Sequence, residues 1–269
     1  MISIIVPALN EEETIGLCLM SIINQNINRD LYEIIVVDGH SSDRTVKIAS
    51  GFADKIVTQK SAGIGGARMD GVNVSRGDVL VFTDSDTMHD MKWLEVVQRN
   101  MIGHEASTGP ILFYDGNIRS DILTLWRKGY QIFHLFNFYW LIGSNMAIKR
   151  ETYDKINGHS SISILDDFDI SMKLFKEGDI QTRYDKDQIV YTSSRRIDNL
   201  MQYMLVFGYG HYHYHLTKNY DNLLNYPRFD EMDLGTVLNI SDRFDGFGNI
   251  EKFNSIYSNL RSRLARENQ

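Results

Sequence analysis

The sequence holds little of several residue types whose abundance would mark particular classes of protein. Its 269 residues include one cysteine, Cys18, which excludes an internal disulfide framework and a zinc site built from several cysteines. A single cysteine also fits a reducing compartment, so we expect a cytoplasmic protein. The chain has only three prolines and no linker rich in proline or glycine, which favours one continuous domain.

Long hydrophobic runs and an excess of basic charge are also missing. The longest stretch without a formally charged residue, 129–148, is interrupted by polar side chains, which argues against a transmembrane helix. The first residues, MISIIVPALNEEE, have no basic segment and only a short apolar run, which is unlike a secretory signal peptide. With 28 basic and 35 acidic residues the net charge is −7, which argues against broad electrostatic binding of nucleic acid.

What the sequence does contain is an alternation of strand and helix patterns. A continuous apolar run predicts a strand buried on both faces at residues 2–6, and further strands are predicted at 33–38, 55–58 and 79–84. Helical patterns follow the first three strands, and the first helix is expected to begin at Asn10 as its N-cap, with Glu13 completing a capping box. Strands that alternate with helices predict an α/β fold with a mostly parallel central sheet flanked by helices.

The pattern loosens beyond residue 105. Further strands are expected within residues 106–116 and 138–150, and a helix within 163–178 is expected to end at Gly178. Residues 250–268 place apolar side chains on one face of a last helix.

Polar clusters follow each of the four predicted parallel strands. They are PALNEE at 7–12, DGHSSD at 38–43, QKSAGIGGAR at 59–68 and DSDT at 84–87. Because the carboxyl ends of parallel strands meet at one edge of a sheet, we expect these loops to form one binding site. Asp84 and Asp86 can supply the oxygen ligands that Mg²⁺ or Mn²⁺ prefers, and the metal would neutralise a diphosphate. Taken alone, the two aspartates could instead cap a helix or form an Asx-turn.

In their order and spacing, several segments resemble family 2 glycosyltransferases of the GT-A fold. They are SIIVPALNEEETI, EIIVVDGHSSDRT, GGARMDG, VLVFTDSDT, GSNMAIKRETYDKINGH and LDDFDISMKLFKEGD, and the resemblance runs from residue 2 to about residue 196. It implies the GT-A fold and a metal-dependent, inverting transfer of a hexosyl or N-acetylhexosaminyl group. The donor would be a nucleotide-diphosphate sugar, the acceptor a hydroxyl of a glycan, a lipid-linked or a small molecule, and the cofactor Mn²⁺ or Mg²⁺.

The resemblance also implies roles for individual residues at the predicted edge. The nucleotide would be bound by Pro7, Leu9, Glu11, Asp38, Arg68, Asp84 and Ser85. Asp86 would ligate the metal, and Asp84 would bind the ribose or help to position the metal. Each residue has a structural alternative: Glu11 could stabilise the first turn of its helix, and Arg68 could be a solvated helix residue.

The segment LDDFD carries the predicted catalytic acids. The resemblance makes Asp167 the general base and Asp166 its variant neighbour, because related proteins commonly have Glu-Asp at this place. Transfer needs one carboxylate that accepts the proton of the attacking hydroxyl, and a second acid nearby can raise the pKa of that base. The alternative is an acidic start to a helix, which is the role we expect for Asp169.

Two further features follow the predicted base. Arg195 and Arg196 could bind the departing diphosphate through bidentate contacts, or could be surface residues. His211, His213 and His215 recur at every second residue. By resemblance one of them, which we assign as His211, is a further metal ligand, and the alternative is an aromatic packing or acceptor surface.

We expect a glycosyltransferase domain at residues 1–220 and a helical C-terminal extension at 221–269. The domain would comprise a nucleotide-binding half, 1–104, and an acceptor and catalytic-base half, 105–220. The competing functions are a catalytically silent sugar-nucleotide-binding module and a nucleotidyltransferase on a related fold. A dinucleotide-binding oxidoreductase is disfavoured, because PALNEE stands where its glycine fingerprint belongs.

The aromatic segment 126–143 and the C-terminal arginines bear on the acceptor and the membrane. Aromatic rings beside basic side chains suit a membrane interface. This leaves open a peripheral contact with the cytoplasmic face of a membrane. The alternatives are core packing of the aromatic residues and a homodimer contact of the last helix.

Overall fold

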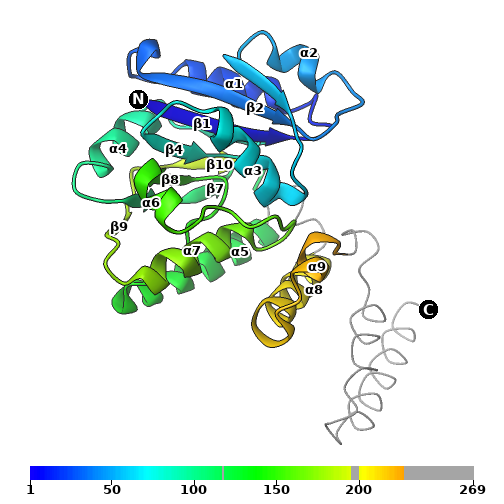
Figure 1. Cartoon of the computed structure of the whole chain (residues 1–269), viewed down its shortest axis with the longest axis vertical. Coiled ribbons are helices and arrows are strands. Elements are labelled where there is room, and N and C mark those ends of the chain that lie inside the picture. Colours follow the sequence, from blue (N-terminus) through cyan, green and yellow to red (C-terminus); the bar gives the residue numbers. More distant parts are fainter. Residues whose placement is uncertain (117, 195–199, 227–269) are drawn as a thin grey trace, which may run out of the picture. The chain divides into compact units, whose positions relative to one another are not determined.

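The computed structural model of the protein describes residues 1–116, 118–194 and 200–226, which lie in the compact unit Met1–Pro227 (Figure 1). Its strands are β1 Ile2–Ala8, β2 Tyr32–Asp38, β3 Lys55–Thr58, β4 Val79–Phe82, β5 Thr87–His89, β6 Ala106–Thr108, β7 Ile111–Phe113, β8 Met146–Lys149, β9 Thr182–Tyr184 and β10 Val190–Thr192. Its helices are α1 Ile15–Ile23, η1 Arg29–Leu31, α2 Thr45–Ala49, α3 Gly63–Val74, α4 Trp93–Asn100, α5 Ile118–Tyr130, η2 Gln131–Phe136, α6 Arg150–Lys155, α7 Asp166–Glu177, α8 Leu200–Tyr212, η4 His213–Thr217 and α9 Tyr220–Leu224.

The main sheet has seven strands in the order β3-β2-β1-β4-β8-β6-β9. Strands β3, β2, β1 and β4 run parallel, whereas β8 is antiparallel to both β4 and β6. A smaller sheet, β5-β10-β7, forms from the segments that follow β4 and β6 and from β10. The predicted α/β fold with a mostly parallel sheet is therefore confirmed, and the antiparallel strand β8 separates its two halves.

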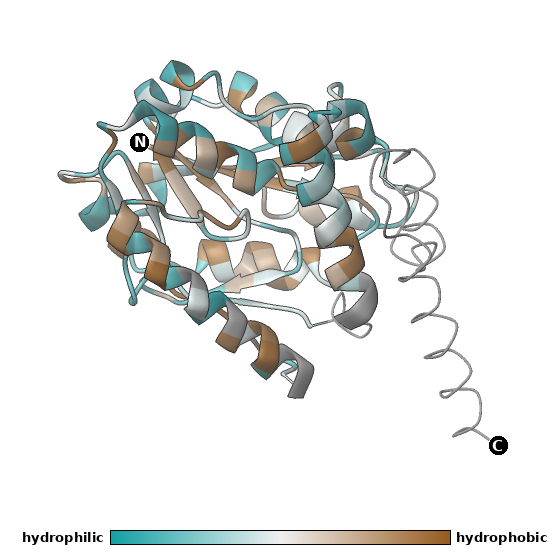
Figure 2. Ribbon diagram, turned by 90° about the horizontal axis from the view of Figure 1, so that it is seen from below, coloured by the Kyte–Doolittle hydropathy of each residue, from teal (hydrophilic) through white to brown (hydrophobic). Residues whose placement is uncertain are grey.

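Apolar side chains on both faces of the sheet explain why the first strands are continuous hydrophobic runs. Ile4 and Val6 of β1 pack with Ile15 and Leu19 of α1 in one core cluster. Ile5, which points to the opposite face, packs in a second cluster that includes residues of α3 and α7. Figure 2 shows these hydrophobic strands lying between the helices. Helices on both faces leave the strand ends as the place where polar side chains can gather.

Glycines in α3 serve close packing between elements. A Cβ atom at Gly65 would collide with the backbone carbonyl of Ser160, just before α7, and one at Gly71 would press on Ile5 of β1. Only glycine fits at these two contacts, because any larger residue would push α3 away from the sheet or from α7. Close packing here brings the third edge loop and the predicted base together.

The start of the first helix differs from the prediction. Helix α1 begins at Ile15 with Thr14 at its N-cap position, and Asn10 lies well before it. Asn10 adopts a left-handed backbone conformation with φ 53°, and its side chain accepts a hydrogen bond of 2.8 Å from the backbone of Ser42. Asn10 therefore joins the loops after β1 and β2 instead of capping α1. The predicted C-cap is confirmed, because Gly178 ends α7 with φ 73°.

Several predicted features lie outside the described residues. They include Arg195, Arg196 and the amphipathic segment 250–268. Within the described ranges, no helix is long and apolar enough to span a membrane.

Candidate active site

The loops after β1 and β2 meet at the carboxyl edge of the sheet, as their register requires. Ala8 pairs with Asp38, and the backbone amide of Gly39 donates to the carbonyl of Ala8 at 2.8 Å. Leu9, which follows directly, is 55% exposed although it is apolar. Glu11 is buried and accepts a hydrogen bond of 2.9 Å from the hydroxyl of Thr14. Pro7, Leu9, Glu11 and Asp38 thus lie on two neighbouring strands and their loops.

The DSDT loop follows β4 after one intervening residue, Thr83, and is fixed by two other elements. The carboxylate of Asp84 is partly exposed, and its backbone carbonyl accepts a contact of 3.4 Å from the Sγ of Cys18 in α1. Ser85 and Asp86 are buried. Asp86 Oδ1 accepts a hydrogen bond of 3.4 Å from the hydroxyl of Thr192 at the end of β10. The smaller sheet therefore positions Asp86, because β10 pairs with β5 immediately after it.

Arg68 joins the two acidic motifs. It is 3% exposed in α3, its Nη2 lies 2.8 Å from Asp84 Oδ1, and its Nη1 donates to Asp166 Oδ2. Burial alone would lower the pKa of Arg68, but Asp166 and Asp84 raise it, so the guanidinium stays charged. A Cβ atom at Gly143 would collide with this guanidinium, which explains the glycine before β8. The edge that sequence analysis assigned to the nucleotide is thus tied directly to the start of α7.

Asp167 lies in the first turn of α7, and its surroundings differ from those of Asp166. Its Oδ1 accepts a hydrogen bond of 2.7 Å from the amide of Phe168, and its Oδ2 accepts one of 3.3 Å from the amide of Gly143. Burial raises the pKa of Asp167 to about 6, with a further increase from the charge of Asp166 and an opposing decrease from Arg68. A carboxyl group with this pKa is ionised near neutral pH and still basic enough to accept a proton.

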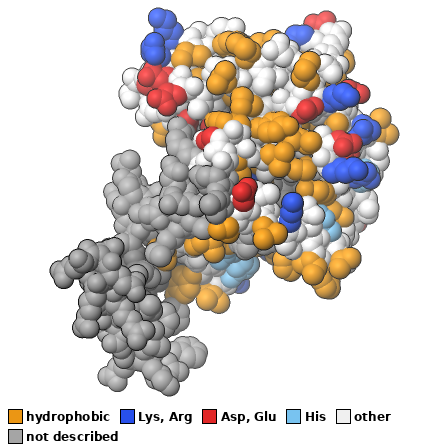
Figure 3. Space-filling view, turned by 180° about the vertical axis from the view of Figure 1, so that it is seen from behind, with side chains coloured by type: hydrophobic (Ala, Val, Ile, Leu, Met, Phe, Trp, Pro, Cys, Tyr) orange, Lys and Arg blue, Asp and Glu red, His pale blue; other side chains and the backbone are white. Residues whose placement is uncertain are grey.

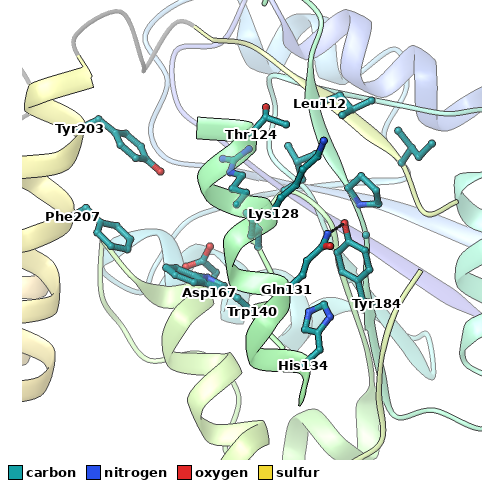
Figure 4. A pocket seen from close by; sticks show the side chains of 16 residues that line it. Leu112, Thr124, Lys128, Gln131, His134, Trp140, Asp167, Tyr184, Tyr203 and Phe207 are labelled. Carbon is teal, nitrogen blue, oxygen red and sulfur yellow. Dashed lines mark hydrogen bonds between the residues drawn. The ribbon is translucent and has the colours of Figure 1, made fainter. Parts of the chain in front are cut away.

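A cavity of about 350 Å³ opens in front of Asp167 (Figure 4). Its walls come from the segment between β6 and β7, from α5 and η2, and from β9, α7 and α8. Tyr203 and Phe207 reach toward it from α8, and Lys128 and Gln131 lie on the side of α5 and η2. Asp167 is the one carboxylate in its wall among the residues that the structure describes. Asp166 does not line the cavity, which separates the two adjacent acids.

The histidines after the predicted base lie in a cluster of aromatic rings. The ring centre of His211 is 4.3 Å from that of Phe207 and 4.8 Å from that of Phe168, and His211 stacks on His215 at 5.5 Å. Burial and the nearby His215 lower the pKa of His211 to about 4, so its ring is neutral. Within the described ranges, no three His, Cys, Asp or Glu side chains form a metal-binding group. A metal-ligand role for His211 stays a prediction.

Asp169 has the structural role that its sequence context predicts. Its carboxylate accepts hydrogen bonds from the hydroxyls of Ser160 at 2.7 Å and Tyr214 at 3.0 Å, and pairs with Lys173 at 2.9 Å. These contacts hold together α7, the segment before it and η4.

Sequence reasoning did not single out the residues that shape the cavity. They include Arg127, Lys128, Gln131 and Tyr184, in α5, η2 and β9, and Thr192 beside Asp86 was missed as well. The only signal was the general expectation that the acceptor site lies within residues 113–140 and the C-terminal tail.

Comparison with known proteins adds to this geometry. The sequence profile described as Glycosyl transferase family 2 matches residues 3–161. The chain is 36% identical over 92 residues to a poly(ribitol-phosphate) beta-glucosyltransferase of Bacillus spizizenii, covering 32% of this chain and 14% of that protein. It is 34% identical over 100 residues to the glycosyltransferase AglE of Haloferax volcanii, covering 35% of this chain and 33% of that protein. The matched region is thus a third or less of each relative's length.

Solved structures show the same fold at low sequence identity. A mannosyltransferase from Pyrobaculum calidifontis, in complex with GDP-Man and Mn²⁺, has a TM-score of 0.61 at 17% identity, covering 96% of this chain and 79% of that one. Glucosyl-3-phosphoglycerate synthase from Mycobacterium tuberculosis, in complex with Mn²⁺, UDP and phosphoglyceric acid, has a TM-score of 0.57 at 21% identity, covering 75% and 74%. Since the family profile covers more than half of its 269 residues, the chain belongs to glycosyl transferase family 2.

Proposed function

We propose that the protein is a metal-dependent, inverting glycosyltransferase that moves a sugar from a nucleotide-diphosphate donor to a hydroxyl acceptor. The observation that carries the proposal is the position of Asp167, a carboxylate with a raised pKa in the wall of a cavity, beside the ion pairs that join α7 to the DSDT loop. The mannosyltransferase with this fold binds GDP-Man and Mn²⁺, which supports a donor of the same class.

The carboxyl edge of the sheet is the proposed donor site. Pro7, Leu9, Glu11 and Asp38 would contact the base and ribose, because β1 and β2 bring them together and Leu9 presents an apolar surface to solvent. Further proposed contacts come from Arg68, Asp84 and Ser85, and from Arg195 and Arg196 outside the described residues. Arg68 would act on the nucleotide chiefly by fixing Asp84, since its guanidinium is already bound to two carboxylates.

The DSDT loop fits a divalent ion that the protein holds through few ligands. Asp86 and Asp84 offer carboxylate oxygens, and Mg²⁺ is commonly held by one or two carboxylates together with substrate phosphates and water. When bound, Mn²⁺ or Mg²⁺ would act as a Lewis acid that stabilises the departing diphosphate.

Asp167 is the proposed general base. It would accept the proton of an acceptor hydroxyl whose oxygen attacks the anomeric carbon from the side opposite the diphosphate. A single displacement of this kind inverts the anomeric configuration. We assign this step to Asp167 and not to Asp166, because Asp166 is bound to Arg68 and lies outside the cavity.

The competing functions do not need this arrangement. A silent sugar-nucleotide-binding module needs the edge of the sheet to bind its ligand. It does not need a carboxylate of raised pKa in the neighbouring cavity. A nucleotidyltransferase is disfavoured, because the loop after β1 is acidic instead of rich in glycine and basic residues.

Replacing Asp86 with alanine is expected to remove metal-dependent donor binding while the fold persists. Thermal shift with UDP-, GDP- and dTDP-sugars, with and without Mn²⁺, is the measurement, since a ligand that binds only the folded state raises the melting temperature. The cognate donor should stabilise the wild-type protein most when Mn²⁺ is present. Asp187→Ala, at an exposed turn, is the matched control and should respond like wild type. An unchanged Mn²⁺-dependent shift in Asp86→Ala would remove Asp86 from the metal site.

The pH dependence of transfer should follow the ionisation of Asp167. Below a pH of about 6 the base is protonated, so kcat/KM should rise about tenfold per pH unit and level off above that value. The charged groups that act on it are Asp166, which raises its pKa, and Arg68, which lowers it; Arg127 and Lys128 line the same cavity. Transfer that is constant from pH 5 upward, or that falls as pH rises through this range, would contradict the assignment.

Contact with a membrane and formation of a homodimer stay predictions. On the face shown in Figure 3, hydrophobic side chains lie among charged ones. In α5 and η2 the side chains of Leu125, Leu135 and Phe136 are between 70% and 81% exposed. Leu135 and Phe136 belong to the aromatic segment 126–143, for which a membrane interface was predicted, and Leu125 directly precedes it. Their exposure leaves these apolar side chains accessible to such an interface.

A further inference from the structure

The cavity in front of Asp167 has two cationic side chains in its wall, although the acceptor group proposed to bind there is a neutral hydroxyl. Part of its lining is apolar and aromatic, with Trp140, Ile142 and Phe207. The lining also includes two cations on consecutive positions of α5, Arg127 and Lys128. Figure 4 shows Lys128 and Gln131 on one side of the cavity, away from Tyr203 and Phe207.

Among the described residues, no anion compensates the charge of Arg127. Its guanidinium lies over the ring of Phe113 at 5.2 Å from the ring centre, and its Nη1 is buried with no hydrogen-bond partner among the described residues. A guanidinium does not lose its proton in proteins, so burial cannot be relieved by neutralisation. A buried donor on a permanent cation is costly unless a ligand satisfies it.

The other polar groups of the cavity do not supply that anion. Gln131 Nε2 donates to the hydroxyl of Tyr184 at 2.9 Å, and both of these groups are neutral. In the part of the chain that the structure describes, no ion pair joins Arg127 or Lys128 to a carboxylate, and Asp167 in the same wall takes its hydrogen bonds from the amides of Phe168 and Gly143. The two cations therefore face the cavity with their charge available to a ligand.

We infer that the cavity is the acceptor site and that it takes a phosphate-bearing acceptor, with Arg127 and Lys128 binding the phosphate and Asp167 facing the hydroxyl to be glycosylated. The inference rests on the proposed function and adds the chemical class of the acceptor. Arginine can bind a phosphate through two parallel hydrogen bonds, and the adjacent lysine adds a second charge. The aromatic wall would cover the carbon skeleton between the two ends, and about 350 Å³ suits a compact ligand.

The reaction balances with these groups alone. The acceptor oxygen forms a bond to the anomeric carbon, and the bond from that carbon to the diphosphate oxygen breaks. The hydroxyl proton passes to the carboxylate of Asp167, and the nucleoside diphosphate leaves with the bonding electron pair. The phosphate of the acceptor takes no part in bond making and only fixes the position of the hydroxyl.

Calorimetric titration with glycerol 3-phosphate, and with glycerol as its uncharged counterpart, tests the inference directly. Wild-type protein is expected to bind the phosphate ester at least about tenfold more tightly than glycerol, because a hydrogen bond to a charged group adds this much or more. The double variant Arg127→Met/Lys128→Met should lose that preference. Lys176→Met, an exposed lysine of α7 outside the cavity, should keep it.

Further variants separate this inference from the proposed donor site and from misfolding. Asp86→Ala should lose nucleotide binding and keep the phosphate-ester preference, so failure of either proposal shows in a different titration. Arg127→Lys retains the charge beside Phe113 but not the forked donor, and should bind the ester with intermediate affinity. Circular dichroism and the melting temperature report whether each variant is folded.

The phosphate could belong to a free metabolite or to a lipid headgroup, and a vesicle arm distinguishes the two. Co-sedimentation is measured with phosphatidylcholine vesicles with and without phosphatidic acid, whose headgroup is a phosphate monoester. Binding of free ester that depends on Arg127 and Lys128 supports a soluble acceptor. Binding only to vesicles with phosphatidic acid, lost in the double variant, supports a lipid-linked one. Binding to neither probe, or binding that the double variant leaves unchanged, would overturn the inference.

Discussion

Replacing Asp167 with asparagine is expected to lower glycosyl transfer by at least about a hundredfold, the lower range for loss of a general base. Donor binding should be kept, because Asp167 lines the cavity and does not touch the DSDT loop through any contact found in the described residues. Asparagine has the same shape and can still accept a hydrogen bond from the amide of Phe168 or Gly143. The measurement is kcat for transfer together with the thermal shift that the donor produces.

The neighbouring acid provides the matched comparison. Asp166→Asn should act mainly on stability, since it weakens the contact with Arg68, and it should keep more transfer activity than Asp167→Asn at saturating donor. A crippled Asp166→Asn beside an active Asp167→Asn would show that the assignment of the base is wrong. Equal losses of donor binding in both variants would show that the start of α7 serves the nucleotide and not the acceptor.

The parallel half of the sheet could be predicted because its information is local. Residues 2–6 and 33–38 are apolar runs that become β1 and β2, and both faces of these strands are buried. Parallel pairing then places the loops that follow at one edge, so Asp38 comes beside the residues after β1 without any knowledge of tertiary contacts. The error at Asn10 arose where tertiary contacts prevail, since Ser42 on another loop takes the side chain that was expected to cap α1.

The rest of the site depends on contacts that a single sequence does not reveal. Asp166 and Asp167 are identical in type and adjacent in α7, yet one faces Arg68 and the other faces the cavity. Arg127 lies far from Asp167 in the sequence, in a helix that mixes apolar and charged residues as a surface helix does. Nothing in that pattern marks its Nη1 as buried. The difference comes from how α5 packs over β7, which places Arg127 over Phe113.

Replacing Arg68 with methionine is expected to lower the free energy of unfolding by about 3–5 kcal/mol, the usual cost of removing one partner from a buried ion pair. Arg68 is 3% exposed and binds Asp84 and Asp166 at once, so its loss leaves two carboxylates without their counter-charge. Methionine keeps much of the aliphatic volume, which limits the loss from packing. Denaturant unfolding gives the change, provided that the slope with denaturant concentration stays the same.

A second measurement separates the charge of Arg68 from its packing. Arg68 opposes the rise in the pKa of Asp167, so its removal should raise that pKa further and shift the rising limb of the pH–rate profile to higher pH. The double variant Arg68→Met/Asp166→Asn should be more stable than Arg68→Met alone. In the single variant both Asp84 and Asp166 lose their counter-charge, whereas in the double variant only Asp84 is left as an unpaired charge. Arg44→Met, which breaks an exposed pair with Glu12, should change neither stability nor pH profile. Wild-type stability in Arg68→Met would show that the bridge between the two acidic motifs contributes nothing, and an unshifted profile would confine Arg68 to a structural role.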